Sequence, residues 1–314
     1  MELRINHYTH TSGTDGLPLA VVRTEPADGT NVRGAALLVH GMCEHKGRYE
    51  PFVRFLAEQG YIVTIFDQRG HGESVRSPED LGYLYEGGYE AMLADIHEMV
   101  LEAKEYAADR TGRTDLPFYM IAHSMGTLCA RCYIRMHDAE LDKLVLLGCP
   151  SKMSGMWPGL QLVKGLIATQ GGHARSKVVD YIVGNGFDKK FAAEKTPHAW
   201  TNSDPEEVRI FNEDPLCGYK FTLNGYENLI RLAMLTYTDG GYAMNKPELP
   251  IRFYSGAEDP CAISKEKLGE AIKLLRKQGY KNTKGKIYPG MRHEILREPE
   301  KAKVWADILA FLQS

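Results

Sequence analysis

One serine of this chain stands in a sequence context that could make it a nucleophile. Ser124 lies within P-F-Y-M-I-A-H-S-M-G-T-L, residues 117–128, where an apolar strand pattern precedes the serine and an apolar helix pattern follows it. A sharp turn between strand and helix exposes such a serine and requires small residues two places before and two places after it. Ala122 and Gly126 occupy these places. The pattern therefore predicts a nucleophile at Ser124.

A serine hydroxyl needs a general base and a carboxylate that orients the base. Where the serine lies on such a turn, the acid and then the histidine follow it in the chain, each after a late strand. Asp259 follows the predicted strand 251–255, and His293 is the only one of 11 histidines after the last predicted strand. The neighbouring Glu258 is the alternative acid. We prefer Asp259 because Pro260 stiffens its loop.

Attack on a carbonyl also requires two N–H donors for the oxyanion. Met125 follows the nucleophile at the predicted start of a helix, where the helix dipole favours negative charge. The loop after the predicted strand 33–39 begins at His40 and Gly41, and Met42 comes next. We expect Met42 and Met125 to supply the two backbone donors.

The elements that must position these residues alternate between strands and helices. Such alternation predicts the α/β class, with a mostly parallel, doubly wound sheet. The expected strands cover residues 17–24, 33–39, 61–66, 117–122, 143–147, 251–255 and 285–288, and the expected helices cover 49–59, 89–109, 125–137, 264–278 and 299–312.

The alternation stops after Pro150 and returns near residue 240, with many glycines between short amphipathic segments. We expect a core made of residues 1–150 and 240–314 and an inserted helical cap of residues 151–239. The first part of the insertion is rich in flexible methionine and leucine side chains, which suit an acyl chain, although they could simply pack the cap onto the core. The expected substrate contacts there are Met153, Met156, Trp157 and Leu160.

Composition narrows the function further. With 38 basic and 41 acidic residues the net charge is −3, so the chain has no overall positive charge that would attract a nucleic acid. No run of 18 apolar residues and no secretory signal are present, so we expect a cytoplasmic protein with its six cysteines reduced. Cys129 and Cys132 form C-x-x-C inside an apolar helical stretch, not at a helix start, which disfavours redox chemistry.

No cofactor is expected. The loop H-G-M-C-E-H lacks the G-x-G-x-x-G of dinucleotide sites, and no histidine and cysteine cluster has zinc spacing. The polar loop that contains Asp67, Arg69 and His71 reads as structural, because a buried ion pair can satisfy loop backbone groups.

Five segments together resemble the monoacylglycerol lipase and lysophospholipase branch of the α/β-hydrolases. They are H-G-M-C-E-H-K-G-R-Y (40–49), F-D-Q-R-G-H-G-E-S (66–74), A-H-S-M-G (122–126), S-G-A-E-D (255–259) and the loop at His293. The resemblance implies an α/β-hydrolase fold, the nucleophile Ser124, the acid Asp259, the base His293 and the oxyanion donors Met42 and Met125. Cys43 and Ala122 depart from the branch, which usually has glycine there. Cys43 is therefore a further candidate substrate contact.

The resemblance also implies a serine hydrolase that cleaves lipid esters, such as a monoacylglycerol or a lysophospholipid, through an acyl-enzyme. An amphipathic cap could touch a membrane surface transiently, and the sequence leaves the oligomeric state open. A short-chain carboxylesterase or thioesterase would use the same residues. A proline-iminopeptidase-like peptidase would need an acidic cluster, for which the cap offers Glu206, Glu207, Glu213 and Asp214. A non-catalytic binding protein on this scaffold is the remaining alternative.

Overall fold

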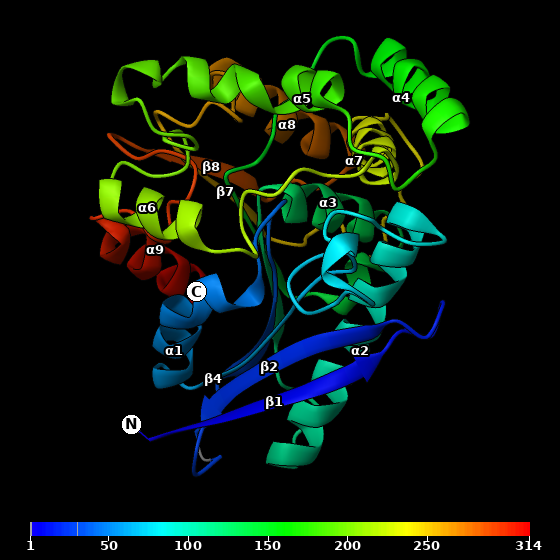
Figure 1. Cartoon of the computed structure of the whole chain (residues 1–314). Helices are drawn as coiled ribbons and strands as arrows, with labels where there is room; N and C mark the ends of the chain where they lie inside the picture. The colour runs from blue at the N-terminus through cyan, green and yellow to red at the C-terminus, as the bar shows by residue number, and fades with distance from the viewer. Residues whose placement is uncertain (1, 30) are drawn as a thin grey trace.

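The computed structural model describes residues 2–29 and 31–314. Within these residues the centre of the molecule is one sheet of eight strands in the order β1-β2-β4-β3-β5-β6-β7-β8 (Figure 1). β1 and β2 pair antiparallel, as do β2 and β4, and all other neighbours are parallel. The strands are β1 (Leu3–Thr11), β2 (Pro18–Pro26), β3 (Gly34–Val39), β4 (Tyr61–Phe66), β5 (Phe118–His123), β6 (Lys143–Leu147), β7 (Ile251–Gly256) and β8 (Thr283–Tyr288).

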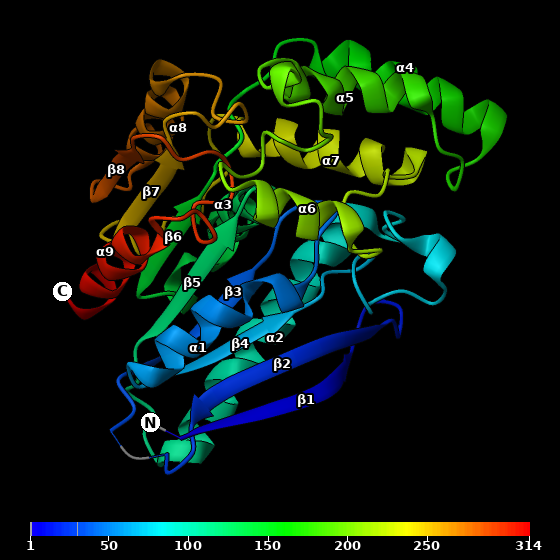
Figure 2. The same cartoon turned by 60° about the vertical axis from the view of Figure 1, so that its left-hand side comes forward.

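Helices cover both faces of the sheet (Figure 2). One face packs against α1 (Glu50–Glu58) and α9 (Lys301–Gln313), and the other against α2 (Gly88–Thr111), α3 (Met125–His137) and α8 (Lys265–Gln278). β3, β4 and β5 are buried along their whole length, as expected for parallel strands covered on both faces. Short 3₁₀ helices occur at η1 (Lys46–Tyr49), η2 (Pro78–Asp80), η3 (Asp138–Glu140) and η4 (Ala192–Glu194).

The predicted α/β class and doubly wound sheet are confirmed. The residues of α3 and β6 match the prediction, and the other predicted elements are displaced by only a few residues at their ends. β1 was not predicted. Its nine residues are only partly buried or exposed, because it is an edge strand that pairs with β2 alone, so it has no continuous apolar signal.

Four helices lie between β6 and β7 in the chain: α4 (Met156–Gln170), α5 (Lys177–Lys189), α6 (Pro205–Glu213) and α7 (Leu223–Thr236). They lie over the carboxyl ends of the central strands (Figure 1). We call them the cap helices, and we propose that residues 151–239 form a unit distinct from the core.

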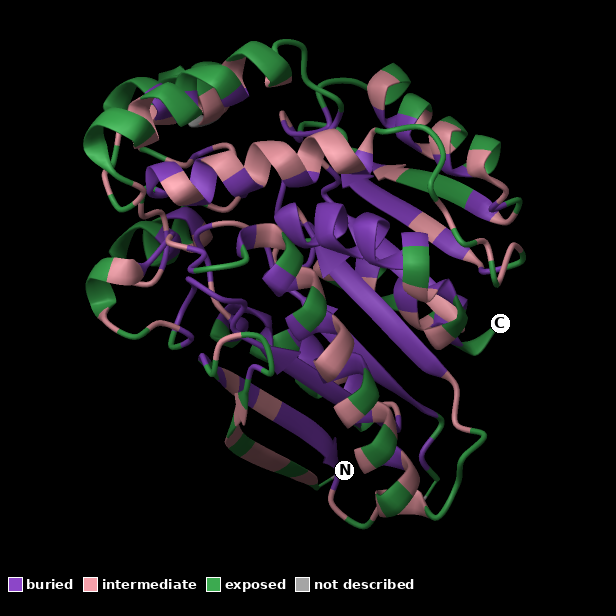
Figure 3. Cartoon of the chain, turned by 90° about the vertical axis from the view of Figure 1, so that its right-hand side faces the viewer, coloured by how far each residue is buried: buried purple, intermediate pink, exposed green. Residues whose placement is uncertain are grey.

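The cap helices join the core in two ways. α7 packs on α2 and α3, while α4 packs on α7 and presents a largely exposed outer face (Figure 3). The two ends of the segment meet, because the Tyr237 hydroxyl donates to the Pro150 carbonyl at 2.6 Å. None of the described helices combines the length and the apolar character that crossing a membrane requires.

Candidate active site

Ser124 lies between the last residue of β5 and the first residue of α3, with φ 49° and ψ −120°. This left-handed backbone is strained for a residue with a side chain, and such strain is typical of functional turns. Hydrogen bonds hold the turn: the Ser124 N–H donates to the Leu147 carbonyl at 2.9 Å, and the Thr127 N–H donates to the Ser124 carbonyl at 2.8 Å. The predicted strand, turn and helix are therefore present around the serine.

The surroundings of Gly126 explain why the residue two places after Ser124 must be small. A Cβ atom there would lie 2.3 Å from the Val39 carbonyl oxygen and 2.6 Å from that of His40. α3 thus approaches the end of β3 so closely that only glycine fits. On the other side of the serine Ala122 is fully buried in β5, so its methyl group is accommodated.

The loops after β7 and β8 bring the expected acid and the expected base together. The His293 ring nitrogen Nδ1 lies 3.0 Å from Asp259 Oδ1, and both residues are buried. The Cys261 N–H also donates to Asp259 Oδ1, at 2.9 Å, which fixes the carboxylate. The alternative acid Glu258 instead forms an exposed ion pair with Lys190 at 2.9 Å. The pairing supports Asp259 over Glu258 as the partner of the imidazole.

Ser124 and His293 line the same cavity. A Cβ atom at Gly148 would lie 3.1 Å from Cε1 and Nδ1 of the imidazole, so this glycine leaves room for the ring beside the end of β6. No hydrogen bond joins the Ser124 hydroxyl to the His293 ring among the described residues. In the absence of substrate this contact is often long in hydrolases.

The two expected oxyanion donors flank the serine. Met42 and Met125 both line the cavity that contains Ser124. Neither backbone N–H donates to any residue that the structure describes, and the one at Met125 is at the start of α3, where helix N–H groups lack intrahelical partners. Gly41 lets the loop approach, since a Cβ atom there would lie 2.9 Å from the Ser124 Cβ. The arrangement leaves both donors free for an oxyanion.

The cavity has a volume of about 470 Å³ and extends from Ser124 beneath α4, α5 and α7. This volume lies within the range of small-molecule sites. Of the predicted substrate contacts, Cys43, Met153 and Met156 line it. Cys43 also has a positive φ of 55°, the backbone region that glycine adopts most readily.

Two predicted substrate contacts, Trp157 and Leu160, do not line the cavity, so their prediction was wrong. Trp157 is 64% exposed on the outer side of α4, and Leu160 is buried away from the cavity. The α4 residues that line it are Met156, Gly159, Leu162 and Val163. With 3.6 residues per turn, Trp157 points about 100° away from Met156. Sequence composition alone could not fix this rotation of the helix.

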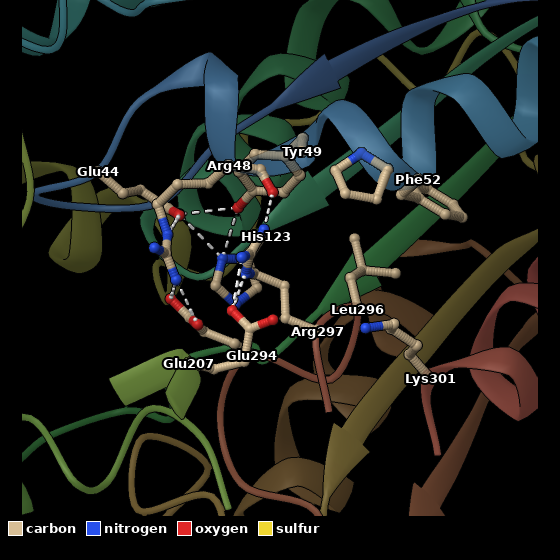
Figure 4. A pocket seen from close by; sticks show the side chains of 11 residues that line it. Glu44, Arg48, Tyr49, Phe52, His123, Glu207, Glu294, Leu296, Arg297 and Lys301 are labelled. Carbon is tan, nitrogen blue, oxygen red and sulfur yellow. Dashed lines mark hydrogen bonds and ion pairs between the residues drawn. The ribbon is translucent and has the colours of Figure 1, made fainter. Parts of the chain in front are cut away.

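A buried polar cluster includes His123, the residue before Ser124, and the sequence analysis assigned this cluster no role (Figure 4). The Glu44 carboxylate accepts hydrogen bonds from the Tyr49 hydroxyl at 2.7 Å and pairs with His123 Nδ1 at 3.1 Å. Arg48 donates to the Glu294 carboxylate at 2.7 and 2.9 Å. These residues line a small cavity of about 50 Å³. Three of them, Glu44, His123 and Glu294, also line the large cavity, so the two spaces adjoin.

Glu44 also fixes the loop that carries the expected donor Met42, because its carboxylate accepts the Gly41 N–H at 2.5 Å. Burial alone would raise the pKa of Glu44, but the hydrogen bond and charge of His123 hold it well below its ordinary value. Burial would lower the pKa of His123, but the hydrogen bond and charge of Glu44 raise it. The two shifts describe one buried ion pair between the loop and the residue before Ser124.

We expect Glu44→Gln to lower the free energy of unfolding by about 3 kcal/mol, as when one partner of a buried pair is removed. The contribution of Glu44 to the free energy of unfolding is present above the ordinary carboxyl pKa of about 4.3 and is lost as the pH falls. The His123 contribution is present below about 6.5 and is lost as the pH rises through its raised pKa. Urea unfolding at several pH values should therefore show the largest difference between about pH 4.5 and 6.5. A pH-independent difference would contradict the ion pair.

The contacts of the polar loop after β4 support a structural role for this loop. Asp67 accepts the Lys46 N–H at 2.7 Å and the Glu73 N–H at 2.9 Å, and Arg69 pairs with Asp95 at 2.7 Å. Asp67, Arg69 and His71 are not among the residues that line the cavity of Ser124. These contacts hold the loop backbone, as the sequence suggested.

Comparisons with known proteins agree with this geometry. A family model described as serine aminopeptidase, S33, matches residues 30–300. A monoacylglycerol lipase of Mycolicibacterium smegmatis is 25% identical over 288 residues, which are 91% of this chain and 90% of that protein.

Solved structures share the fold along the whole chain. A thermostable carboxyl esterase from Bacillus coagulans, in complex with glycerol, has a TM-score of 0.87 at 24% identity and covers 98% of both chains. A soluble variant of the monoglyceride lipase from Saccharomyces cerevisiae, in complex with a substrate analog, has a TM-score of 0.72 at 20% identity and covers 98% of this chain and 94% of that one. At these identities the likeness concerns the fold.

Proposed function

Because the chain belongs to the serine aminopeptidase S33 family of α/β-hydrolases, in its monoacylglycerol lipase-like branch, we propose that it hydrolyses lipid esters through an acyl-enzyme on Ser124. The observation that carries the proposal is the buried pair of Asp259 and His293, 3.0 Å apart, in which His293 lines the same cavity as a strained serine. This is the arrangement that turns a hydroxyl into a nucleophile.

In the first half of the reaction, Ser124 Oγ attacks the ester carbonyl while His293 takes its proton. Asp259 stabilises the imidazolium, and the N–H groups of Met42 and Met125 stabilise the oxyanion. The carbon–oxygen bond to the alcohol breaks, and the imidazolium returns the proton to the leaving alkoxide. In the second half a water molecule gives its proton to His293 and attacks the acyl-enzyme. The carboxylic acid leaves, and the proton returns to Ser124.

The two adjoining cavities support an amphipathic substrate. The large one is lined by methionine, leucine, valine and aromatic side chains, which suit an acyl chain. Arg48 lines the small one, and its Nε and Nη1 atoms are buried without a hydrogen-bond partner among the described residues, with Nε 3.8 Å from the Glu44 carboxylate. Such orphaned donors favour an oxygen-rich group. We therefore place the acyl chain beneath the cap helices and the polar head of a monoacylglycerol or a lysophospholipid toward Arg48.

The peptidase alternative has less support. It needs free acidic groups near the serine, but the four candidate carboxylates of the cap are engaged elsewhere. Glu206 and Glu213 pair with Arg209 on the surface, Glu207 pairs with Arg297, and Asp214 pairs with His45.

A series of nitrophenyl esters tests the substrate proposal. Each methylene buried in the cavity contributes about 0.8 kcal/mol, so kcat/KM should rise about fifteenfold for every two methylene groups beyond acetate, until the cavity is filled. A maximum at acetate would contradict the lipid proposal and favour the short-chain esterase. Thioesters of the same chain lengths, measured in parallel, separate esterase from thioesterase activity.

Exposed apolar side chains on the cap support transient contact with a lipid surface. In α4 and α5, Trp157, Val178 and Tyr181 are each more than half exposed and do not line the cavity of Ser124, and Lys164 and Lys177 nearby are exposed. Apolar groups flanked by lysines favour anionic interfaces. In sedimentation with anionic vesicles we expect the double variant Trp157→Ser and Val178→Ser to bind at least about fivefold more weakly, from the lost apolar area. Equal binding would contradict this contact.

A further inference from the structure

Two groups of side chains in the described part of the chain combine a thiol, an imidazole and a carboxylate at metal-ligand separations. One is Asp259, Cys261 and His293, and the other is His45, Asp214 and Cys217; in each, the ligand atoms lie within 4.8 Å of one another. Imidazole nitrogen, thiolate sulfur and carboxylate oxygen are the donor set of zinc. The first group, which we call the inner cluster, contains the expected base and acid of the triad. The second, the outer cluster, lies where the loop after β3 meets the end of α6.

The inner cluster has the features of a preformed binding site. Its three residues are each no more than 6% exposed. Asp259 Oδ2 is buried without a hydrogen-bond partner among the described residues, and such an orphaned acceptor carries a desolvation cost that a cation would relieve. Cys261 and His293 also line the large cavity, so an ion entering by the substrate's route reaches them.

The outer cluster is less suited to a metal. His45 Nε2 lies 2.8 Å from Asp214, and His45 Nδ1 accepts the Gly47 N–H at 3.2 Å. The ring proton is therefore on Nε2. A metal on Nε2 would move this proton to Nδ1, where it would face the Gly47 N–H. Metal-binding histidines normally donate from the second nitrogen to an acceptor, and here the partner is a donor.

We propose that Asp259, Cys261 and His293 bind a zinc ion, which inhibits the enzyme. On binding, the thiol of Cys261 releases its proton to solvent and the ring proton of His293 moves from Nδ1 to Nε2, so that the sulfur, Nδ1 and a carboxylate oxygen coordinate the ion. Zinc then separates the carboxylate from the imidazole. The imidazole can no longer be oriented and stabilised as the base. The ion is an inhibitor and takes no part in the reaction. The inhibition rests on the proposed function, whereas the binding does not.

Direct binding is measured with Co²⁺ in place of Zn²⁺, because a thiolate bound to cobalt absorbs in the near ultraviolet. We expect the absorption in the wild type, in Ser124→Ala and in Cys217→Ser, and its loss in Cys261→Ser. Persistence in Cys261→Ser with loss in Cys217→Ser would assign the metal to the outer cluster and overturn the proposal. No absorption in the wild type would also overturn it. Thermal unfolding of each variant excludes a misfolded Cys261→Ser.

Inhibition is measured as the Zn²⁺ concentration that halves each variant's own metal-free rate of ester hydrolysis. Losing a direct ligand should cost at least as much as losing a partner of a ligand, so we expect Cys261→Ser to raise this concentration roughly 100-fold. Cys217→Ser should behave as the wild type. Equal zinc sensitivity in Cys261→Ser would overturn the inhibition. If the wild type hydrolyses no ester and resists fluorophosphonate labelling, the proposed function fails while the cobalt experiment still decides the binding.

Discussion

Ser124→Ala should lower kcat for ester hydrolysis on the order of 10⁶-fold, the scale on which a serine hydrolase loses activity without its nucleophile. Alanine fits the strained turn no worse than serine, so the Asp259 and His293 pair should persist. Rates with a nitrophenyl ester measure the loss. Labelling with a fluorophosphonate, which reacts with an activated serine, should disappear in the same variant.

Ser154→Ala is the matched control for the nucleophile. Ser154 also lines the large cavity and is exposed. It lies just before α4, and no histidine is close to it in the sequence. Its rate and labelling should match those of the wild type. Residual turnover of Ser124→Ala within tenfold of the wild type would contradict the acyl-enzyme on Ser124.

Asp259→Asn should lower kcat about 10⁴-fold, because an amide in this place favours the wrong tautomer of the imidazole and gives no charge to stabilise the imidazolium. The substitution preserves size in a site that is 4% exposed, and its carbonyl can still accept the Cys261 N–H. The expected result is slow hydrolysis and slow fluorophosphonate labelling in a folded protein.

Glu258→Gln is the control for the acid, since it removes the adjacent carboxylate, whose ion pair with Lys190 is half exposed. We expect less than a twofold change in rate, as surface ion pairs contribute little. If Glu258→Gln lost activity and Asp259→Asn retained it, the acid would be Glu258 and the triad assignment would be wrong.

The sequence predicted what depends on local pattern and chain order. The nucleophile turn needs only residues 117–128, and the positions of Asp259 and His293 follow from strands that are continuous in the chain. The structure brings Asp259 and His293 together.

The sequence analysis missed features that depend on the rotation of a helix about its axis, or on contacts between residues far apart in the chain. Trp157 was misplaced because helical periodicity gives the spacing of α4 residues but not which side faces the serine. The polar cluster joins the loop before α1 to the end of β5 and the loop after β8, and Glu44 and Glu294 are 250 residues apart in the chain. Glu44 belongs to a quoted motif and Glu294 directly follows His293, but only the fold shows that the two residues line one buried space.

The hydrogen bond from Tyr237 to Pro150 has a consequence for engineering. It holds Pro150, the residue before the cap segment, beside Tyr237 near the end of that segment, so the segment could be cut out and another spliced in without altering the spacing of β6 and β7. Closing a short linker there costs little conformational entropy, and domain grafting succeeds at such junctions. Chimaeras that exchange the cap segment would retain the catalytic core and change which acyl chains it accepts.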